Sequence, residues 1–126
     1  MERITNQEFN EKMRERTKQF ALQVIALSDQ LSNKESARVI NRQLLRSATS
    51  VAANFRAACR GRSKAEFYSK VCIVVEEADE TQFWLELLVD SKLIDNNHAS
   101  VIKLITEISE ILAVTTSIKS KLYQNK

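Results

Sequence analysis

The chain contains no proline and a single glycine, Gly61, among its 126 residues. β-Hairpins, β-sandwiches and glycine-rich phosphate loops need these residues for their turns, so the shortage argues against all three. The two cysteines, Cys59 and Cys72, have a spacing that fits no zinc or redox motif, and a chain of this length buries a core without such staples. We therefore expect an all-helical protein with buried, reduced thiols.

Residues typical of catalytic and metal sites are also scarce. The only histidine, His98, lies in the polar segment NNHAS, where we expect a solvated turn. Helical HExxH, nucleophile-elbow and Walker patterns are missing from the sequence. The acidic cluster Glu76, Glu77, Asp79 and Glu80 has no accompanying histidine, and we interpret it as a solvated or interface band. These features predict a protein that is not an enzyme and needs no metal or other cofactor.

The N-terminal segment is charged from its second residue and carries no apolar core of a signal peptide. Nowhere does an apolar run approach the length of about 18 residues that a membrane span needs. We therefore expect a cytoplasmic protein without a membrane partner. The net charge is only +3, so attraction to a polyanion must come from the placement of the charges.

Apolar residues recur at intervals of three and four in four successive segments, which predicts four amphipathic helices. Thr5 and Glu8 form a capping box before the first, and Ser63 and Glu66 form one before the third. Gly61 is expected to end the second helix in the left-handed conformation. The expected core residues are Phe9, Met13, Phe20, Val24, Leu27, Leu31, Ala37, Ile40, Leu44, Ala48, Val51, Phe55, Cys59, Phe67, Val71, Val74, Ala78, Leu85, Leu88, Val101, Leu104, Ile105, Ile108, Ile111, Leu112, Ile118 and Leu122.

The four predicted helices have similar lengths, each about 25 residues or ~37 Å. Short connections between helices of equal length require that consecutive helices run antiparallel. The sequence therefore predicts an up-down-up-down four-helix bundle in a single domain over residues 1–126, with helices packed at about 20°.

Five arginines lie on one face of the second predicted helix. A step of about 100° per residue places them within a stripe ~80° wide, on the side opposite the apolar residues. We call this set the arginine row: Arg38, Arg42, Arg46, Arg56 and Arg60. The row predicts a surface that binds phosphate groups or carboxylates, because the planar guanidinium reaches two oxygens at once.

A second charged face lies on the third predicted helix, away from its core side. We call it the acidic band: Glu76, Asp79, Glu80, Glu86 and Asp90. The arginine row and the acidic band are complementary and can meet within one chain or between subunits of a ring, or the row can simply be solvated. Phe83 and Trp84 lie off the centre of the core stripe, which favours an oligomer interface that includes them with Glu76 and Glu80, although they can also cap the edge of the core.

Three stretches carry a resemblance that covers about residues 16–119: RTKQFALQVIALSDQL, ARVINRQLLRSATSVAANFRAACRGRSKAEFYSKVCIVVEEADETQFWLELL and DSKLID. They closely resemble the four-helix-bundle family named for proteins encoded in intervening sequences of bacterial large-subunit ribosomal RNA genes. The resemblance implies an up-down bundle that assembles as a homopentamer. In one branch, the accessory proteins of diversity-generating retroelements, it also implies nucleic-acid binding through a basic surface beside a reverse transcriptase.

Two classes of function follow from these observations. One is a non-enzymatic oligomer that binds RNA or DNA backbones through the arginine row, whose one-turn steps of about 5.4 Å approach the phosphate spacing of a stretched strand. Because no aromatic residues interleave with the row, such binding would have little sequence preference. The alternative is a structural or adaptor homo-oligomer that binds a protein partner and uses the arginines in subunit contacts.

Overall fold

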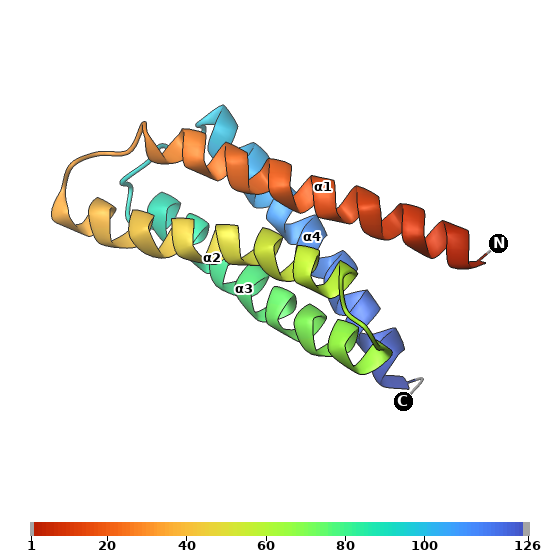
Figure 1. Cartoon of the computed structure of the whole chain (residues 1–126). Coiled ribbons are helices and arrows are strands. Elements are labelled where there is room, and N and C mark those ends of the chain that lie inside the picture. The colour runs from red at the N-terminus through yellow and green to blue at the C-terminus, as the bar shows by residue number, and fades with distance from the viewer. Residues whose placement is uncertain (1, 125–126) are drawn as a thin grey trace.

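The computed structural model describes residues 2–124, and the side chains of residues 6–124. Four helices make up the fold: α1 (Glu2–Ser28), α2 (Glu35–Cys59), α3 (Lys64–Asp90) and α4 (Ala99–Gln124). Consecutive helices run antiparallel and are joined by short connections (Figure 1). The predicted all-α four-helix bundle is confirmed.

The helices pack in cyclic order, so that α1 contacts α2 and α4, and α3 contacts α2 and α4. The α2–α3 pair packs most extensively and the α1–α4 pair least. The apolar residues spaced at threes and fours meet in one hydrophobic core, in which Phe20, Leu44, Phe55, Leu85 and Ile108 are almost or fully buried. This core fixes which face of each helix points to solvent, and thereby positions the charged faces.

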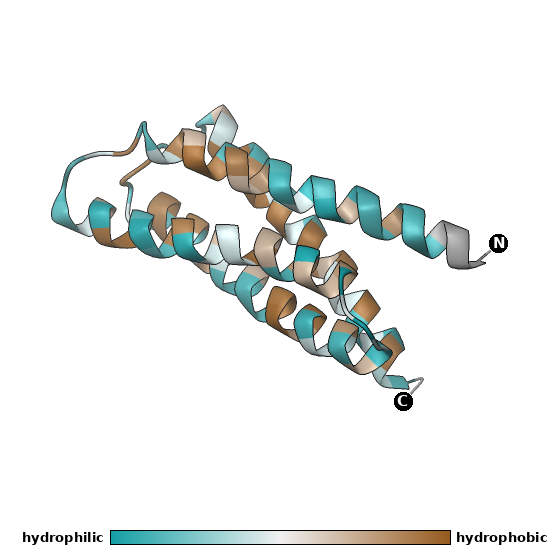
Figure 2. Ribbon diagram, in the orientation of Figure 1, coloured by the Kyte–Doolittle hydropathy of each residue, from teal (hydrophilic) through white to brown (hydrophobic). Residues whose placement is uncertain are grey.

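The first half of α1 departs from the expected packing. In Figure 2 this half is mostly hydrophilic, and the brown hydrophobic colour gathers in the second half of the helix. Phe9, predicted to lie in the core, is 40% exposed. It lines an open apolar groove of about 680 Å³ that α1 forms with the start of α3 and the second half of α4. Val114 and Ile118 of α4 also line this groove. The prediction for Phe9 was wrong because α1 and α4 do not close against each other at this end.

Burial is also incomplete at the edges of the other predicted stripes. Several predicted core residues are only half-buried at the margins of the bundle: Leu31, Cys59, Phe67, Ile105, Leu112, Ile118 and Leu122. Helical periodicity gives the direction of the core but not how wide a stripe the neighbouring helices cover.

The helix ends correct two sequence predictions. Helix α1 begins at Glu2, so Thr5 lies within it and not at its N-cap, and the Thr5 side chain lies outside the described part of the chain. Gly61 does not adopt a left-handed conformation. A Cβ at this position would lie 3.1 Å from the Ala58 carbonyl oxygen and 3.2 Å from the Phe67 nitrogen, closer than ordinary van der Waals contact, so glycine relieves crowding where the two chain segments approach each other.

The second capping box is confirmed in part. The Ser63 hydroxyl accepts a hydrogen bond from the Glu66 amide (3.1 Å), which starts α3 as expected. The Glu66 carboxylate, however, accepts from the Arg62 amide (3.0 Å) instead of the Ser63 amide. Among the residues that the structure describes, Lys92 has the left-handed conformation (φ 64°). Helix α3 ends there, with paired hydrogen bonds from the Lys92 amide to the Val89 carbonyl and from the Leu93 amide to the Leu88 carbonyl.

Candidate nucleic-acid interface

Helix α2 presents the whole arginine row to solvent. The opposite face buries Ala37, Ile40, Leu44, Val51 and Phe55 in the core, and this burial orients the helix about its axis. The five arginines of the row are all exposed, as the sequence predicts. They differ in their partners, however, and this difference divides the row.

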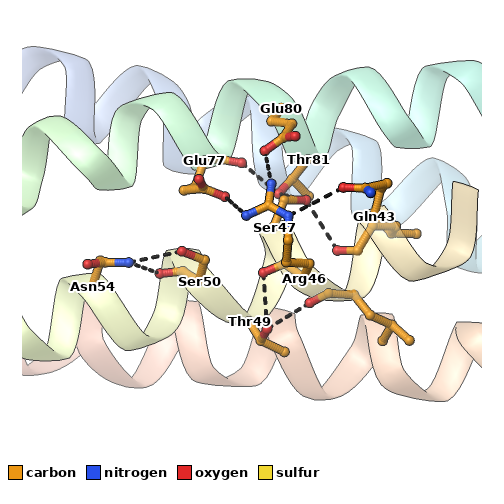
Figure 3. Close-up of polar contacts among 11 residues, drawn as sticks. Gln43, Arg46, Ser47, Thr49, Ser50, Asn54, Glu77, Glu80 and Thr81 are labelled. Atoms are coloured by element: carbon orange, nitrogen blue, oxygen red, sulfur yellow. Dashed lines mark hydrogen bonds and ion pairs between the residues drawn. The ribbon is translucent and has the colours of Figure 1, made fainter.

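Arg46 is committed to carboxylates of its own chain. Its Nη1 donates to Glu77 Oε2 (3.1 Å) and its Nη2 to Glu80, both on α3 (Figure 3). The hydrogen bond with Glu80, followed by the charge of Glu77, raises the pKa of the Arg46 guanidinium. The sequence allows the arginine row and the acidic band to meet within one chain or between subunits. For Arg46 and Glu80 the ion pair forms within one chain.

A buried pair of hydroxyl groups lies beneath this ion pair. The Ser47 and Thr81 oxygens lie 2.9 Å apart across the α2–α3 seam, and both side chains are fully buried (Figure 3). The Thr81 hydroxyl donates to the Ser47 hydroxyl, which in turn donates to the Leu44 carbonyl (3.2 Å). The buried hydrogen bond between Ser47 and Thr81 thus links α2 to α3, and the ion pairs of Arg46 lie on the solvent side of it.

The remaining arginines of the row have few partners among the described residues. Arg38 makes one long contact with Glu35 (3.8 Å) between two exposed side chains. Within residues 6–124, Arg42, Arg56 and Arg60 make no ion pair. Three of the five arginines thus carry positive charge that no ion pair within the described residues offsets.

Two cations outside the arginine row, which helical periodicity alone does not relate to it, line a groove with Arg56 and Arg60. Arg14 and Lys18 of α1 line the same groove, about 540 Å³ in volume, which we call the α1–α2 groove. Its other lining residues are Glu15, Ala21, Thr49, Ala52 and Ala53. The spacing of Arg14 and Lys18 by one helical turn is visible in the sequence, but only the packing of α1 on α2 brings them to the arginine row.

The predicted oligomer interface lies on the outer side of α3. Phe83 is 50% exposed and contacts Trp84 edge-to-face, with ring centroids 4.9 Å apart. Trp84 is half-buried and packs against the core, so it also caps the core edge as the alternative interpretation proposed. Glu76 is exposed, as are the other members of the acidic band that face away from α2: Asp79, Glu86 and Asp90.

The residues considered for catalysis and metal binding remain dispersed. Among the described residues, no three His, Cys, Asp or Glu side chains come close enough together to hold a metal ion. His98, expected to be solvated, is half-buried in the turn before α4, where its carbonyl accepts from the Ile102 amide. Cys59 and Cys72 are free thiols but only half-buried, and burial raises the pKa of Cys59. No helix in the described range is both long and apolar enough to cross a membrane.

Fold and surface together define an antiparallel four-helix bundle that carries a basic face on α1 and α2 and an acidic face on α3. The model of the 23S rRNA-intervening sequence protein family matches residues 10–114, and the chain belongs to this family. It is also similar to a crystal structure from Bacteroides thetaiotaomicron, described as a protein with unknown function from the S23 ribosomal protein family. The two are 32% identical, the match covers 88% of this chain and 97% of that one, and the TM-score is 0.78. No curated protein matches the sequence.

Proposed function

We propose that this protein is a non-enzymatic homo-oligomer that binds the sugar-phosphate backbone of RNA or DNA through the basic face of α2. The observation that carries the proposal is the exposure of Arg42, Arg56 and Arg60 without a carboxylate partner in the described chain. Arginine suits this role because its guanidinium donates two parallel hydrogen bonds to phosphate oxygens. The family resemblance supports the same function and a pentameric assembly.

The surface favours contacts to the backbone over contacts to bases. The arginine row contains no aromatic side chain on which a base can stack, and the rings of Phe83 and Trp84 belong to α3. Binding should therefore depend on salt and vary little with sequence.

The test compares two variants with equal changes in net charge. In the first, glutamine replaces Arg38, Arg42, Arg56 and Arg60. In the control, glutamine replaces four exposed lysines on α3 and α4: Lys64, Lys70, Lys103 and Lys121. We expect the arginine variant to lose at least tenfold in affinity in a mobility-shift assay near 50 mM salt, and the lysine variant to lose much less. An absence of binding by the wild-type protein at that salt concentration refutes the function, because polyelectrolyte attraction is strong there.

Arg46 is left out of these variants because of its partners. Reversing its charge with Arg46→Glu would add a carboxylate next to Glu77 and Glu80, so that three carboxylates meet, and would weaken the α2–α3 seam itself. A loss of binding by such a variant would then report on folding.

A structural or adaptor homo-oligomer is the second candidate, favoured by the exposed Phe83 next to the outward carboxylates of the acidic band. A cyclic ring uses two different patches on each subunit, which suits a chain with one basic and one acidic face. In this case the partner is a protein, such as the reverse transcriptase of the resembling branch, and the arginines serve subunit contacts.

Light scattering on the same variants separates the two candidates. If the basic face binds nucleic acid, the arginine variant loses binding and keeps the mass of the wild-type oligomer. If the arginines form subunit contacts, the variant dissociates. Phe83→Ser should lower the oligomer mass in either case, and an unchanged mass would remove Phe83 from the interface.

A further inference from the structure

The α1–α2 groove brings together four cations from two helices, and their positions along the groove follow from the helix register. Asn41 donates to the Ser28 hydroxyl (2.9 Å), and the Cys59 thiol lies 3.7 Å from the Asn10 carbonyl oxygen. In both pairs the two residue numbers add to 69. Residues that face each other across the antiparallel helices obey the same relation.

This register places the cations at three levels. Arg60 lies at one end of the groove, Arg14 and Arg56 lie nearly opposite each other in the middle, and Lys18 lies at the other end, within one residue of the level of Ala52. From Arg60 to Lys18 the backbone positions span about 13 Å at 1.5 Å per residue. A stretched strand with phosphates about 6 to 7 Å apart places three consecutive phosphates over this length.

Small side chains line the groove between the two helices. Ala21, Thr49, Ala52 and Ala53 leave room for a backbone to approach, and no aromatic side chain lines the groove. Its one carboxylate, Glu15, is exposed and accepts a hydrogen bond from Gln19 on the same helix (3.0 Å). The lining therefore carries four positive charges against one negative charge.

We infer that the α1–α2 groove is the binding unit for nucleic acid and holds three consecutive phosphates of one strand between Arg14 and Lys18 of α1 and Arg56 and Arg60 of α2. The bases point away from the groove, because nothing in its lining stacks on them or reads their edges. The inference rests on the proposed function and narrows the binding surface to two of the five arginines of the row, with α1 as a second contributor. Arg38, Arg42 and Arg46 lie outside this unit.

A pair of double variants tests the inference in the full-length protein. Arg14→Gln with Arg56→Gln removes two charges from the middle of the groove. Arg38→Gln with Arg42→Gln removes two charges from the same face of α2 outside it, so the change in net charge is equal. The probe is a fluorescent 20-nucleotide oligothymidylate, followed by anisotropy between about 50 and 200 mM salt.

We expect the groove variant to lose at least tenfold in affinity at the lowest salt and the control less than threefold. The slope of log affinity against log salt should become shallower by about 0.7 in the groove variant, because both substituted residues flank the middle phosphate and each lost phosphate contact on a single strand contributes ~0.7. A duplex of the same length, measured in parallel, shows whether the strand comes from single-stranded or paired nucleic acid.

A third variant tests the groove without changing its charge. Ala53 is exposed, so Ala53→Leu keeps the helix and fills the space between the cations. Blocked access should weaken binding of the oligothymidylate at least threefold, with unchanged helicity by circular dichroism.

The possible results distinguish failure of the inference from failure of the function. Wild-type binding with equal losses in the two double variants, or a larger loss in the control, overturns the groove and leaves backbone binding intact. Dissociation of the oligomer in the groove variant overturns the inference by assigning the groove to a subunit contact. No binding by the wild-type protein refutes the function and the inference together.

Discussion

Replacing Leu44 with alanine probes the centre of the bundle. Leu44 is fully buried in the middle of α2, one turn from Ile40 and from Ala48, and belongs to a core to which all four helices contribute. The substitution removes three carbon atoms from a close-packed site, and its neighbours lie on helices that cannot move independently.

The expected cost is about 2 to 5 kcal/mol, which combines the lost transfer energy with the cavity left behind. We expect about 3 kcal/mol or more, because the long helices around Leu44 restrict the collapse that would fill the cavity. Val39→Ala on the same helix is the control. Val39 is 45% exposed, so its truncation should cost less than about 1 kcal/mol.

Urea unfolding followed by circular dichroism measures both variants against the wild-type protein. The experiment is done at two protein concentrations, because an oligomer that dissociates on unfolding has a concentration-dependent midpoint. A cost below about 0.5 kcal/mol for Leu44→Ala would refute the assignment of this face to the core.

Three further predictions concern the seams between helices. Ser47→Ala and Thr81→Ala should each lower the free energy of unfolding in urea by about 1 to 2 kcal/mol, because each change leaves the other buried oxygen with fewer partners. The double variant should lose less than the sum of the two, and strict additivity would contradict this pairing. Arg16 donates to Glu107 (2.6 and 2.8 Å) across the α1–α4 seam, and Arg16→Gln should cost about 1 kcal/mol because both side chains keep a quarter to a third of their exposure; no measurable loss in thermal unfolding would show that the pair is dispensable. Burial raises the pKa of the Cys59 thiol above its ordinary value of 9.0. As pH rises, the thiol therefore loses its proton in the unfolded chain before it does so in the folded protein. The contribution of Cys59 to the free energy of unfolding should fall as pH rises from 9.0 through the raised pKa. A Cys59→Ser variant with the same alkaline decline in stability would contradict that assignment.

Much of the fold could be predicted from the sequence. The shortage of glycine and proline and the recurrence of apolar residues at threes and fours determine four helices, because both are properties of local segments. The same periodicity placed the arginine row on the solvent side of α2 and Phe83 on the outside of α3, and the structure agrees. Positions such as Leu44 and Leu85, in the middle of an apolar stripe, are buried whatever the neighbouring helix contributes.

Properties that depend on two helices together were decided only by the tertiary structure. Arg46 and Arg56 are equivalent as members of one row, yet Arg46 pairs with carboxylates on α3, whereas Arg56 lines the groove with Arg14 of α1. The exposure of Phe9 likewise depends on how far α4 lies from the start of α1. Helical periodicity specifies the angle of a side chain about its own axis, but its neighbours depend on the order and register in which the helices pack.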